Sequence, residues 1–350
     1  MTPTPASHDP ILGCLLGTAA ADALGLPYEM LSRRRGRRIY GIPDRHRFCF
    51  GRGMVSDDTE HTCMVAQALL ASRGDVALFR RHLARHLRGW LLGVPAGIGL
   101  ATLRAILRLW TGRGPENSGV FSAGNGPAMR SAILGASLDD LDTLRSFVRA
   151  STRITHTDPK AEFGALAVAL AAWTVRQPQP LNPDHYLQQL QAWLPQDSAE
   201  LIGLLSQAIT SIRANQSTEA FADTLGLSNG VTGYVYHTVP VAIHAWLTHP
   251  QDFRSAVTSI IACGGDTDST GAIVGGIVGT ALGREGIPQE WLSGLLEWPR
   301  SVTWMERLSA QFTAPAPSPP RLPLYAILPR NLFFLLIVLF HGFRRLLPPY

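Results

Sequence analysis

The sequence predicts an all-α fold, organised as a single orthogonal multi-helix domain. Apolar residues recur at helical spacing through most of the chain, and no clear set of alternating, strand-like segments appears. Small residues recur at every fourth position in two apolar stretches, which indicates two helices in close contact. The 350 residues are 46% hydrophobic and 16% charged, so the chain can bury a large core.

Composition divides the chain into a domain and a C-terminal appendage. Residues 1–313 are expected to form the domain, 314–323 a proline-rich linker, and 324–350 an apolar C-terminal helix. The wholly apolar run Leu332–Phe340 is about half of the roughly 20 residues that a membrane span needs. We therefore expect no membrane span, and a helix that docks on the core or on a partner. An in-plane membrane anchor is the alternative, because arginines flank the run.

The net charge of +5 and the pI near 9.3 would suit a nucleic-acid-binding protein. However, Lys160 is the only lysine, so the positive charge is almost entirely arginine. The one dense basic run, Arg33–Arg38, contains no interleaved aromatic residue and no nucleic-acid-binding motif. We expect a solvated or substrate-facing loop there, and no specific nucleic-acid partner.

The four cysteines, Cys14, Cys49, Cys63 and Cys263, show no paired spacing, which argues against a disulfide framework or a zinc site. No basic segment precedes the apolar stretch that starts at Ile11, so a signal peptide is not expected. The expected compartment is the reducing cytoplasm.

The first expected element is a glycine-spaced helix near the N-terminus. A buried glycine costs about 1 kcal/mol of helix propensity against alanine, so repeated glycines indicate a packing need. A late helix has the same spacing, and we expect the two helices to lie near the centre and to pack on each other. The residues concerned are Gly13, Gly17, Ala21 and Gly25 in the first helix, and Gly271, Gly275, Gly279 and Gly283 in the late one.

Two acidic residues belong to the first of these helices and its end. If the two glycine-spaced helices are antiparallel, Glu29 approaches the acidic residues that open the late helix. A solvent-exposed glutamate at a helix end is the alternative. Asp22 is expected to be a core residue hydrogen-bonded to backbone groups.

Two acidic clusters open apolar helices. Ser56–Glu60 precedes a helix over His61–Ala71, and Gly265–Ser269 precedes the late glycine-spaced helix. Either cluster could simply cap its helix. Carboxylates at close range repel one another unless a cation lies between them, and Mg²⁺ prefers oxygen ligands. Two such openings that face each other could form a dinuclear metal site at the centre of the domain.

Between these clusters, helices are expected over 76–92 and 100–110, with Pro95–Gly99 between them. Further along, Gly124–Pro127 (Gly-Asn-Gly-Pro) forms a flexible turn with a proline at the first position of a helix. Backbone N–H groups at such a start can reach a pyrophosphate. An ordinary turn that needs positive φ is the commoner meaning of the pattern.

The second half is expected to be helical as well. Thr155–Pro159 (Thr-His-Thr-Asp-Pro) precedes a long helix over Ala161–Val175, and its histidine could be a base, a phosphate donor or a cap. Tyr234 or Tyr236 could stack on adenine or ribose, and core packing is the alternative for either ring. Further helices are expected at 184–194, 198–214 and 241–247.

Five motifs together make the sequence resemble the ADP-ribosylglycohydrolase family, the group that includes the dinitrogenase-reductase-activating glycohydrolases. They occur in the family's order between about Ile11 and about Gly283: Gly13 to Glu29, Ser56–Thr59, Gly124–Gly126, Thr155–His156 with Asp158, and Gly265–Ser269. The sequence departs from the family at one loop. In several arginine-specific relatives the loop that corresponds to Pro95–Gly99 resembles Pro-x-Asp-Ile-Gly. This chain has Gly97 at the position of the acidic residue.

The resemblance implies a Mg²⁺-dependent hydrolase that releases ADP-ribose from a modified protein acceptor, by attack of water at the anomeric carbon. An arginine-linked acceptor is favoured. One alternative is a metal-dependent hydrolase of another ADP-ribosyl linkage or of a phosphorylated small molecule. A non-catalytic ADP-ribose-binding protein is another, although the intact acidic motifs argue against it.

The acidic clusters and the resemblance together assign roles to particular residues. Two Mg²⁺ ions, for which Mn²⁺ can substitute, are expected to be held by Ser56, Asp57, Asp58, Asp266, Asp268 and Ser269. The expected catalytic residues are Glu29, Asp58 and Asp268. The resemblance places bound ADP-ribose against Gly124, Asn125, Gly126, His156 and Tyr234.

Overall fold

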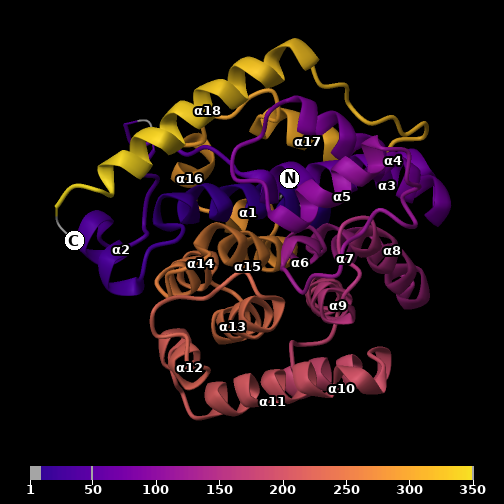
Figure 1. Ribbon diagram of the computed structural model, residues 1–350. Coiled ribbons are helices and arrows are strands. Elements are labelled where there is room, and N and C mark those ends of the chain that lie inside the picture. The colour runs from indigo at the N-terminus through magenta and orange to yellow at the C-terminus, as the bar shows by residue number, and fades with distance from the viewer. Residues whose placement is uncertain (1–8, 49, 349–350) are drawn as a thin grey trace, which may run out of the picture.

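Helices make up the regular structure of residues 9–48 and 50–348, the part of the chain that the computed structural model describes, and no strand occurs there. The predicted all-α class is confirmed. Two helices lie at the centre, α1 (Pro10–Gly25) and α15 (Thr267–Leu282), and the other helices surround them (Figure 1).

Glycines let α1 and α15 approach to backbone contact. A Cβ atom added at Gly13 would lie 2.1 Å from the carbonyl oxygen of Gly279, and one added at Gly17 would lie 2.2 Å from that of Gly275. The contacts run in opposite directions along the two helices, which are therefore antiparallel. The predicted packing is confirmed, and it brings the C-terminal end of α1 to the N-terminal end of α15.

The surrounding helices occupy most of the remaining described chain. The helices expected over 76–92 and 100–110 are present with those bounds. The helices are α3 (Asp57–Ser72), α4 (Val76–Leu92), α5 (Leu100–Trp110), α8 (Leu141–Arg153), α9 (Pro159–Thr174), α10 (Pro183–Trp193), α11 (Ala199–Arg213), α12 (Thr218–Thr224), α14 (Phe253–Ile261), α16 (Gln289–Ser293) and α17 (Val302–Ala310).

Their apolar faces form one large core, in which Trp246 and Trp291 are fully buried. The free cysteines of the described residues lie in this core too: Cys14, Cys63 and Cys263. Cys49 lies outside the described residues.

The arginine run that was expected to be a loop is a helix, α2 (Arg33–Tyr40). The Ser32 hydroxyl accepts a hydrogen bond from the amide of Arg35 at 3.4 Å, which caps the helix start. Arg33 pairs with Asp223 of α12 at 3.0 Å. The loop prediction was wrong because it weighed the polarity of the run and left out its cap and its distant acidic partner.

The single helix expected after the glycine turn is broken into α6 (Gly126–Met129) and α7 (Ala132–Ser137). The break falls where the Ser131 hydroxyl donates to the carbonyl oxygen of Pro127 at 2.6 Å. Arg130 turns into the protein interior at the same point and is completely buried.

α13 (Val235–Thr248) begins before Pro240, and not after it as predicted. The carbonyl oxygen of Tyr234 accepts hydrogen bonds from the amides of His237 at 2.8 Å and Thr238 at 3.0 Å. The first turn is therefore closed before the proline is reached, and Pro240 lies inside the helix.

The C-terminal helix extends well beyond the wholly apolar run Leu332–Phe340. α18 (Leu324–Arg344) has 21 residues and continues through Pro329. It lies along the outside of the molecule, with its C-terminal end beside α2 (Figure 1). Arg330 does not bound the helix, because it points inward and pairs with Glu297 at 2.6 Å. Phe334 packs beside it in a small second core with Leu26, Phe48 and Met54.

Two segments of the described chain are long and apolar enough to cross a membrane by length and composition. The first, Pro10–Tyr28, contains the central helix α1 and is 89% buried. The second, Tyr325–Arg344, is 17% buried. The helix passes the length criterion because its proline and its inner arginine do not end it, so the helix continues beyond the apolar run Leu332–Phe340.

Candidate functional site

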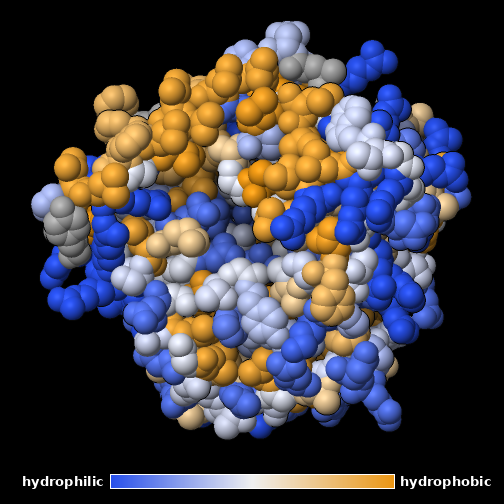
Figure 2. Space-filling model, in the orientation of Figure 1, coloured by the Kyte–Doolittle hydropathy of each residue, from blue (hydrophilic) through white to orange (hydrophobic). Residues whose placement is uncertain are grey.

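The C-terminal end of α1 and the N-terminal ends of α3 and α15 meet around a cavity of about 650 Å³. A hollow with hydrophilic residues at its base opens near the middle of the face shown in Figure 2. The predicted site residues that line the cavity are Glu29, Asp57, Gly124, Asn125, Gly126, His156, Asp266, Asp268 and Ser269. Ser56 and Asp58 are buried beside these residues.

Asp22 of α1 holds the start of α3. Its carboxylate accepts hydrogen bonds from the amide of Ser56 at 2.9 Å, the amide of Thr59 at 3.2 Å and the Thr59 hydroxyl at 2.5 Å. The expected bonding of Asp22 to backbone groups is confirmed. What the sequence did not reveal is that these groups belong to the acidic cluster, so that Asp22 positions Asp57 and Asp58 against α1.

The carboxylate of Asp58 joins the two acidic helix openings. Its Oδ2 accepts a hydrogen bond from Ser56 Oγ at 2.9 Å and, from the α15 side, one from Ser269 Oγ at 3.3 Å. On α15, Asp266 Oδ2 accepts a hydrogen bond from Asn125 Nδ2 at 2.7 Å. The openings of α3 and α15 and the loop before α6 thus meet at one place.

Burial and like charge raise the pKa values of the carboxyl groups here. Burial is the largest cause, and it raises the pKa values of Asp57, Asp58 and Asp268 well above their ordinary range. It also raises the pKa of Glu29 to about 7. Neighbouring carboxylates add to the shift in each case. The folded protein therefore favours protons or cations at this cluster.

The donor atoms suit a hard divalent cation. Oδ1 of Asp58 and Oδ1 of Asp268 are buried without a hydrogen-bond partner, and every candidate ligand offers oxygen. In the described part of the chain, no group of three or more His, Cys, Asp or Glu side chains is already arranged so that it could hold a metal ion. The hydrogen bonds to Asp58 and Asp266 occupy carboxylate oxygens that an ion would take instead.

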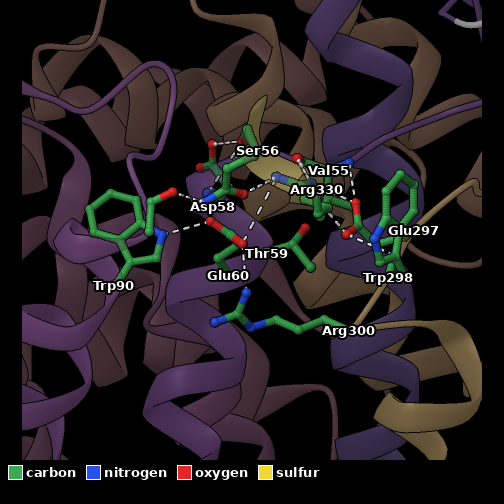
Figure 3. Close-up of polar contacts among 12 residues, drawn as sticks. Val55, Ser56, Asp58, Thr59, Glu60, Trp90, Glu297, Trp298, Arg300 and Arg330 are labelled. Carbon is green, nitrogen blue, oxygen red and sulfur yellow. Dashed lines mark hydrogen bonds and ion pairs between the residues drawn. The ribbon is translucent and has the colours of Figure 1, made fainter. Parts of the chain in front are cut away.

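Two buried ion pairs support the start of α3 (Figure 3). Glu60 accepts a hydrogen bond from Arg300 at 2.6 Å. Glu297 accepts one from Arg330 of α18 at 2.6 Å and one from the amide of Val55 at 3.2 Å. Loss of one partner would leave an uncompensated buried charge, so these pairs fix the acidic segment and connect α18 to it.

His156 and two glycines form another part of the cavity wall. A Cβ atom at Gly124 would lie 3.1 Å from His156 Nε2, and one at Gly126 would lie 3.2 Å from its Cε1. The glycines therefore leave room for the imidazole at the cavity surface. The sequence suggested that backbone N–H groups at the start of a helix would bind a pyrophosphate here. Because α6 is a single turn, the imidazole of His156 is the stronger candidate for a polar contact with a ligand.

A chain of hydrogen bonds influences which ring nitrogen of His156 carries the proton. Arg130 donates to Thr155 Oγ1 at 2.7 Å, and Thr155 Oγ1 lies 2.9 Å from His156 Nδ1. Arg130 uses the hydroxyl as an acceptor, and the hydroxyl proton has two acceptors in reach, His156 Nδ1 at 2.9 Å and the carbonyl oxygen of Thr152 at 3.4 Å. The shorter contact favours donation to Nδ1, which leaves the ring proton on Nε2. Burial, with the charge of Arg130, lowers the pKa of His156 to about 3. His156 is thus a neutral donor at the cavity wall.

We expect Thr155→Val to weaken ADP-ribose binding by roughly three- to tenfold, because the lost hydrogen bond releases the proton from Nε2. Thr152→Val is the matched control, since the buried Thr152 hydroxyl has no hydrogen-bond partner. Calorimetric titration with ADP-ribose measures both. Equal affinities for the two variants would remove the hydrogen-bond chain from ligand recognition.

Tyr234 does not line the cavity, unlike the other predicted ligand contacts. It lies at the start of α13, where its hydroxyl lies 2.9 Å from Nζ of Lys160, which also pairs with Glu200 at 2.6 Å. This contact turns the ring toward α9 and α11. The backbone of Tyr234 still pairs with that of Gly124, so Tyr234 lies next to the candidate residues while its ring points away from the cavity.

The segment 229–233 is a part of the cavity wall that the sequence did not identify. Its backbone joins that of the late acidic cluster, since the amide of Val231 donates to Gly264 at 2.9 Å and the amide of Asp266 donates to Val231 at 2.7 Å. Gly230 has φ +133, and a Cβ atom there would lie 2.6 Å from the amide of Gly265. That glycine was the only sequence signal for the close approach.

Comparisons with known proteins agree with this arrangement. The sequence pattern of the ADP-ribosylglycohydrolase family matches residues 3–320. The chain is 29% identical over 310 residues to ADP-ribosyl-[dinitrogen reductase] glycohydrolase of Rhodospirillum rubrum, covering 83% of this chain and 92% of that protein. It is 25% identical over 334 residues to ADP-ribosylhydrolase ARH3 of Gallus gallus, covering 80% and 87%.

A solved structure of an ADP-ribosylglycohydrolase-related protein complex superposes with a TM-score of 0.62 at 24% identity. The superposition covers 92% of this chain and 98% of that chain. At this identity the likeness concerns the fold alone, and it agrees with the all-α arrangement described above.

Proposed function

The chain belongs to the ADP-ribosylglycohydrolase family and is a hydrolase of ADP-ribosyl linkages, and from this premise we propose that it releases ADP-ribose from arginine-linked protein acceptors with the help of two Mg²⁺ ions. The observation that carries the proposal is the meeting of two acidic helix openings at one cavity, with buried carboxylate oxygens that lack partners. Mn²⁺ is expected to substitute for Mg²⁺.

In this proposal the ions are held by the residues of the two openings, namely Ser56, Asp57, Asp58, Asp266, Asp268 and Ser269. Together with Glu29 these include five carboxylates, whose mutual repulsion two divalent ions would largely offset. When bound, Mg²⁺ polarises oxygen atoms and makes water more acidic. Asp58 and Asp268 would contribute to catalysis as metal ligands. Glu29 is not among the proposed metal ligands.

Glu29 is the proposed proton acceptor. It lines the cavity, and burial holds its pKa near the pH at which a general base works well. The water oxygen forms a bond to the anomeric carbon, the bond from that carbon to the acceptor nitrogen breaks, and Glu29 takes the proton from the water. The same proton can then pass to the departing nitrogen. His156 donates to the ADP-ribose, and Gly124, Asn125 and Gly126 leave room for it.

The charge of the cavity favours a guanidinium acceptor. Among the described residues that line it, four are carboxylates and none is lysine or arginine. Two Mg²⁺ ions carry four positive charges against the five carboxylates of the proposed site, so one negative charge remains, from which a cationic arginine side chain gains and a neutral acceptor does not. The R. rubrum relative is named for a protein substrate, which supports a protein acceptor here as well.

One observation favours a different ADP-ribosyl linkage. Gly97 lines the cavity in a left-handed conformation with φ +78, and nothing lies within 4 Å of its added Cβ position. The loop of arginine-specific relatives has an acidic residue at this position. This chain lacks that residue, and no neighbouring group fills the space of its side chain. A serine-linked acceptor is the second candidate on this ground.

A panel of linkages tests the proposal. We expect the protein with Mg²⁺ to release ADP-ribose fastest from an arginine-linked protein, compared with serine-linked and nucleic-acid-linked ADP-ribose and with phosphorylated small molecules. Faster release from serine would select the second candidate. Hydrolysis of the phosphorylated compounds alone would contradict the assignment to ADP-ribosyl linkages.

The proposal predicts that rising pH removes the stability contributed by two buried carboxyl groups of the metal-free protein, and that Mg²⁺ stabilises the protein most at the higher pH. Burial raises the pKa of Asp22 from 3.8 to about 6 and that of Glu29 from 4.5 to about 7. Between those ordinary and raised values the folded protein keeps protons on these two groups that the unfolded chain has lost, so the stability that Asp22 and Glu29 contribute to the metal-free protein is fully present below about pH 4 and is lost as the pH rises to 7.

Thermal melts across this window, with EDTA or with Mg²⁺, measure the effect. Added Mg²⁺ should raise the melting temperature most at the upper end, where the carboxylates are charged. A Mg²⁺ effect that is the same at every pH would argue against binding at these carboxylates.

A further inference from the structure

We propose that the outer face of α18 binds the surface of an anionic lipid membrane, with the helix lying in the plane of that surface. The outer face is formed by Tyr325, Leu328, Leu332, Leu336, Leu339 and Phe343. These residues follow one another at three or four positions, so they lie on one side of the helix. The helix belongs to the segment beyond residue 320, where the family match ends.

The outer face is exposed along its whole length. The exposed fractions of Tyr325, Leu336 and Phe343 are 85%, 66% and 68%. Figure 2 shows the result as a continuous hydrophobic band along the helix. A helix of 21 residues is about 31 Å long, and an apolar strip of that extent is more than the scattered apolar residues of a normal surface.

The inner face keeps the helix on the domain, which excludes a span. Arg330 is buried in its pair with Glu297, and Asn331 donates to the carbonyl oxygen of Gly93 at 2.7 Å. At the C-terminal end, Arg345 donates to the carbonyl oxygen of Glu29 at 2.8 Å. Crossing a bilayer would break these buried contacts and bring Arg330 into the hydrocarbon. A helix that lies in the interface keeps them all.

The positive charges around α18 favour an anionic lipid surface as the binding partner of its outer face. From Arg307 to Tyr350 the sequence has five arginines and no aspartate or glutamate. Arg321 precedes the helix and Arg344 ends it. At the same end, Arg35 of α2 donates to the carbonyl oxygen of Arg345, and the neighbouring Arg34 is exposed. Basic residues beside an apolar helix face are the pattern that binds anionic headgroups.

The same charges argue against a second copy of the chain on this face. In a twofold contact the arginine-rich end of one helix would meet either its own equivalent or the end marked by Arg321. Neither end has an acidic residue in 307–350 to complement it. An anionic membrane, by contrast, complements both ends at once.

Co-sedimentation of the full chain with vesicles tests the proposal. We expect binding to vesicles of phosphatidylcholine mixed with phosphatidylglycerol, and weaker binding to phosphatidylcholine alone or at high salt. Leu336→Glu with Leu339→Glu should weaken the binding by roughly a hundredfold or more, because charges replace two exposed apolar side chains that the membrane would bury. Arg34→Glu should weaken it by roughly fivefold, on anionic vesicles only.

Leu107→Glu is the matched control, because Leu107 is 49% exposed on α5, away from the outer face. It should bind vesicles as the native chain does. Each variant should also hydrolyse the ADP-ribosyl substrate in solution at the native rate, which would show that it is folded. Native protein that leaves anionic vesicles unbound would overturn the proposal, as would undiminished binding by the double variant. A native dimer that the double variant converts to monomers would assign the face to a second copy and overturn it too.

Discussion

Asp57→Ala and Asp268→Ala are each expected to lower the rate of ADP-ribose release by roughly 10³-fold or more, the upper range for loss of one group that stabilises charge in an active site. Both residues line the cavity, and burial with like charge raises the pKa of each. Removing one carboxylate relieves repulsion in the metal-free protein but deprives the ions of a ligand.

Stability separates this explanation from simple unfolding. The metal-free melting temperature of each variant should equal or exceed that of the native protein, and the rise caused by Mg²⁺ should shrink or vanish. Asp142→Ala is the control, because Asp142 is exposed on α8 and should change neither rate nor melting temperature. A variant that keeps the native rate would remove its residue from the metal site.

Glu29→Gln is expected to lower kcat by about 10²-fold, as the loss of a general base usually does, while ADP-ribose binding stays intact. The backbone of Glu29 is held independently of its side chain, because Arg345 donates to its carbonyl oxygen at 2.8 Å. Its amide also donates to the carbonyl oxygen of Leu26 at 3.3 Å. The amide side chain of glutamine therefore replaces the carboxylate without moving the loop.

Measurement of kcat with a protein-linked substrate, beside calorimetry with ADP-ribose, distinguishes the roles of Glu29. Unchanged turnover would leave the metals to activate water alone. Lost affinity together with lost turnover would mean that Glu29 holds the ligand. Glu285→Gln, at an exposed position in a surface turn, is the control and should behave as the native protein.

The sequence allowed the centre of the fold to be predicted because close helix contact leaves a direct mark. Glycines at four-residue spacing are costly in a helix unless a backbone lies against them, so the helices that contain Gly17 and Gly275 could be expected to pack on each other. The antiparallel pair then brings Glu29 and both acidic helix openings to one cavity. Their roles remain proposals, but their convergence followed from the helices.

Other parts of the site depend on contacts that local sequence does not encode. Asp22 bonds residues 34 and 37 positions away, and the link from Arg130 to Thr155 spans 25 positions. The direction of the Tyr234 ring could not be foreseen, because its hydroxyl contacts Lys160 of another helix. The inward orientation of Arg330 on α18 could not be foreseen for a related reason, since its buried partner Glu297 lies 33 positions away.

Removal and return of Mg²⁺ test the central claim most directly. Native protein is treated with EDTA, exchanged into metal-free buffer, and supplied with an arginine-linked ADP-ribosyl protein, and ADP-ribose release is measured before and after Mg²⁺ is added. Release should be absent in metal-free buffer and should return to the native rate with Mg²⁺, and with Mn²⁺ in its place. Release at the native rate by the chelated protein would contradict the account.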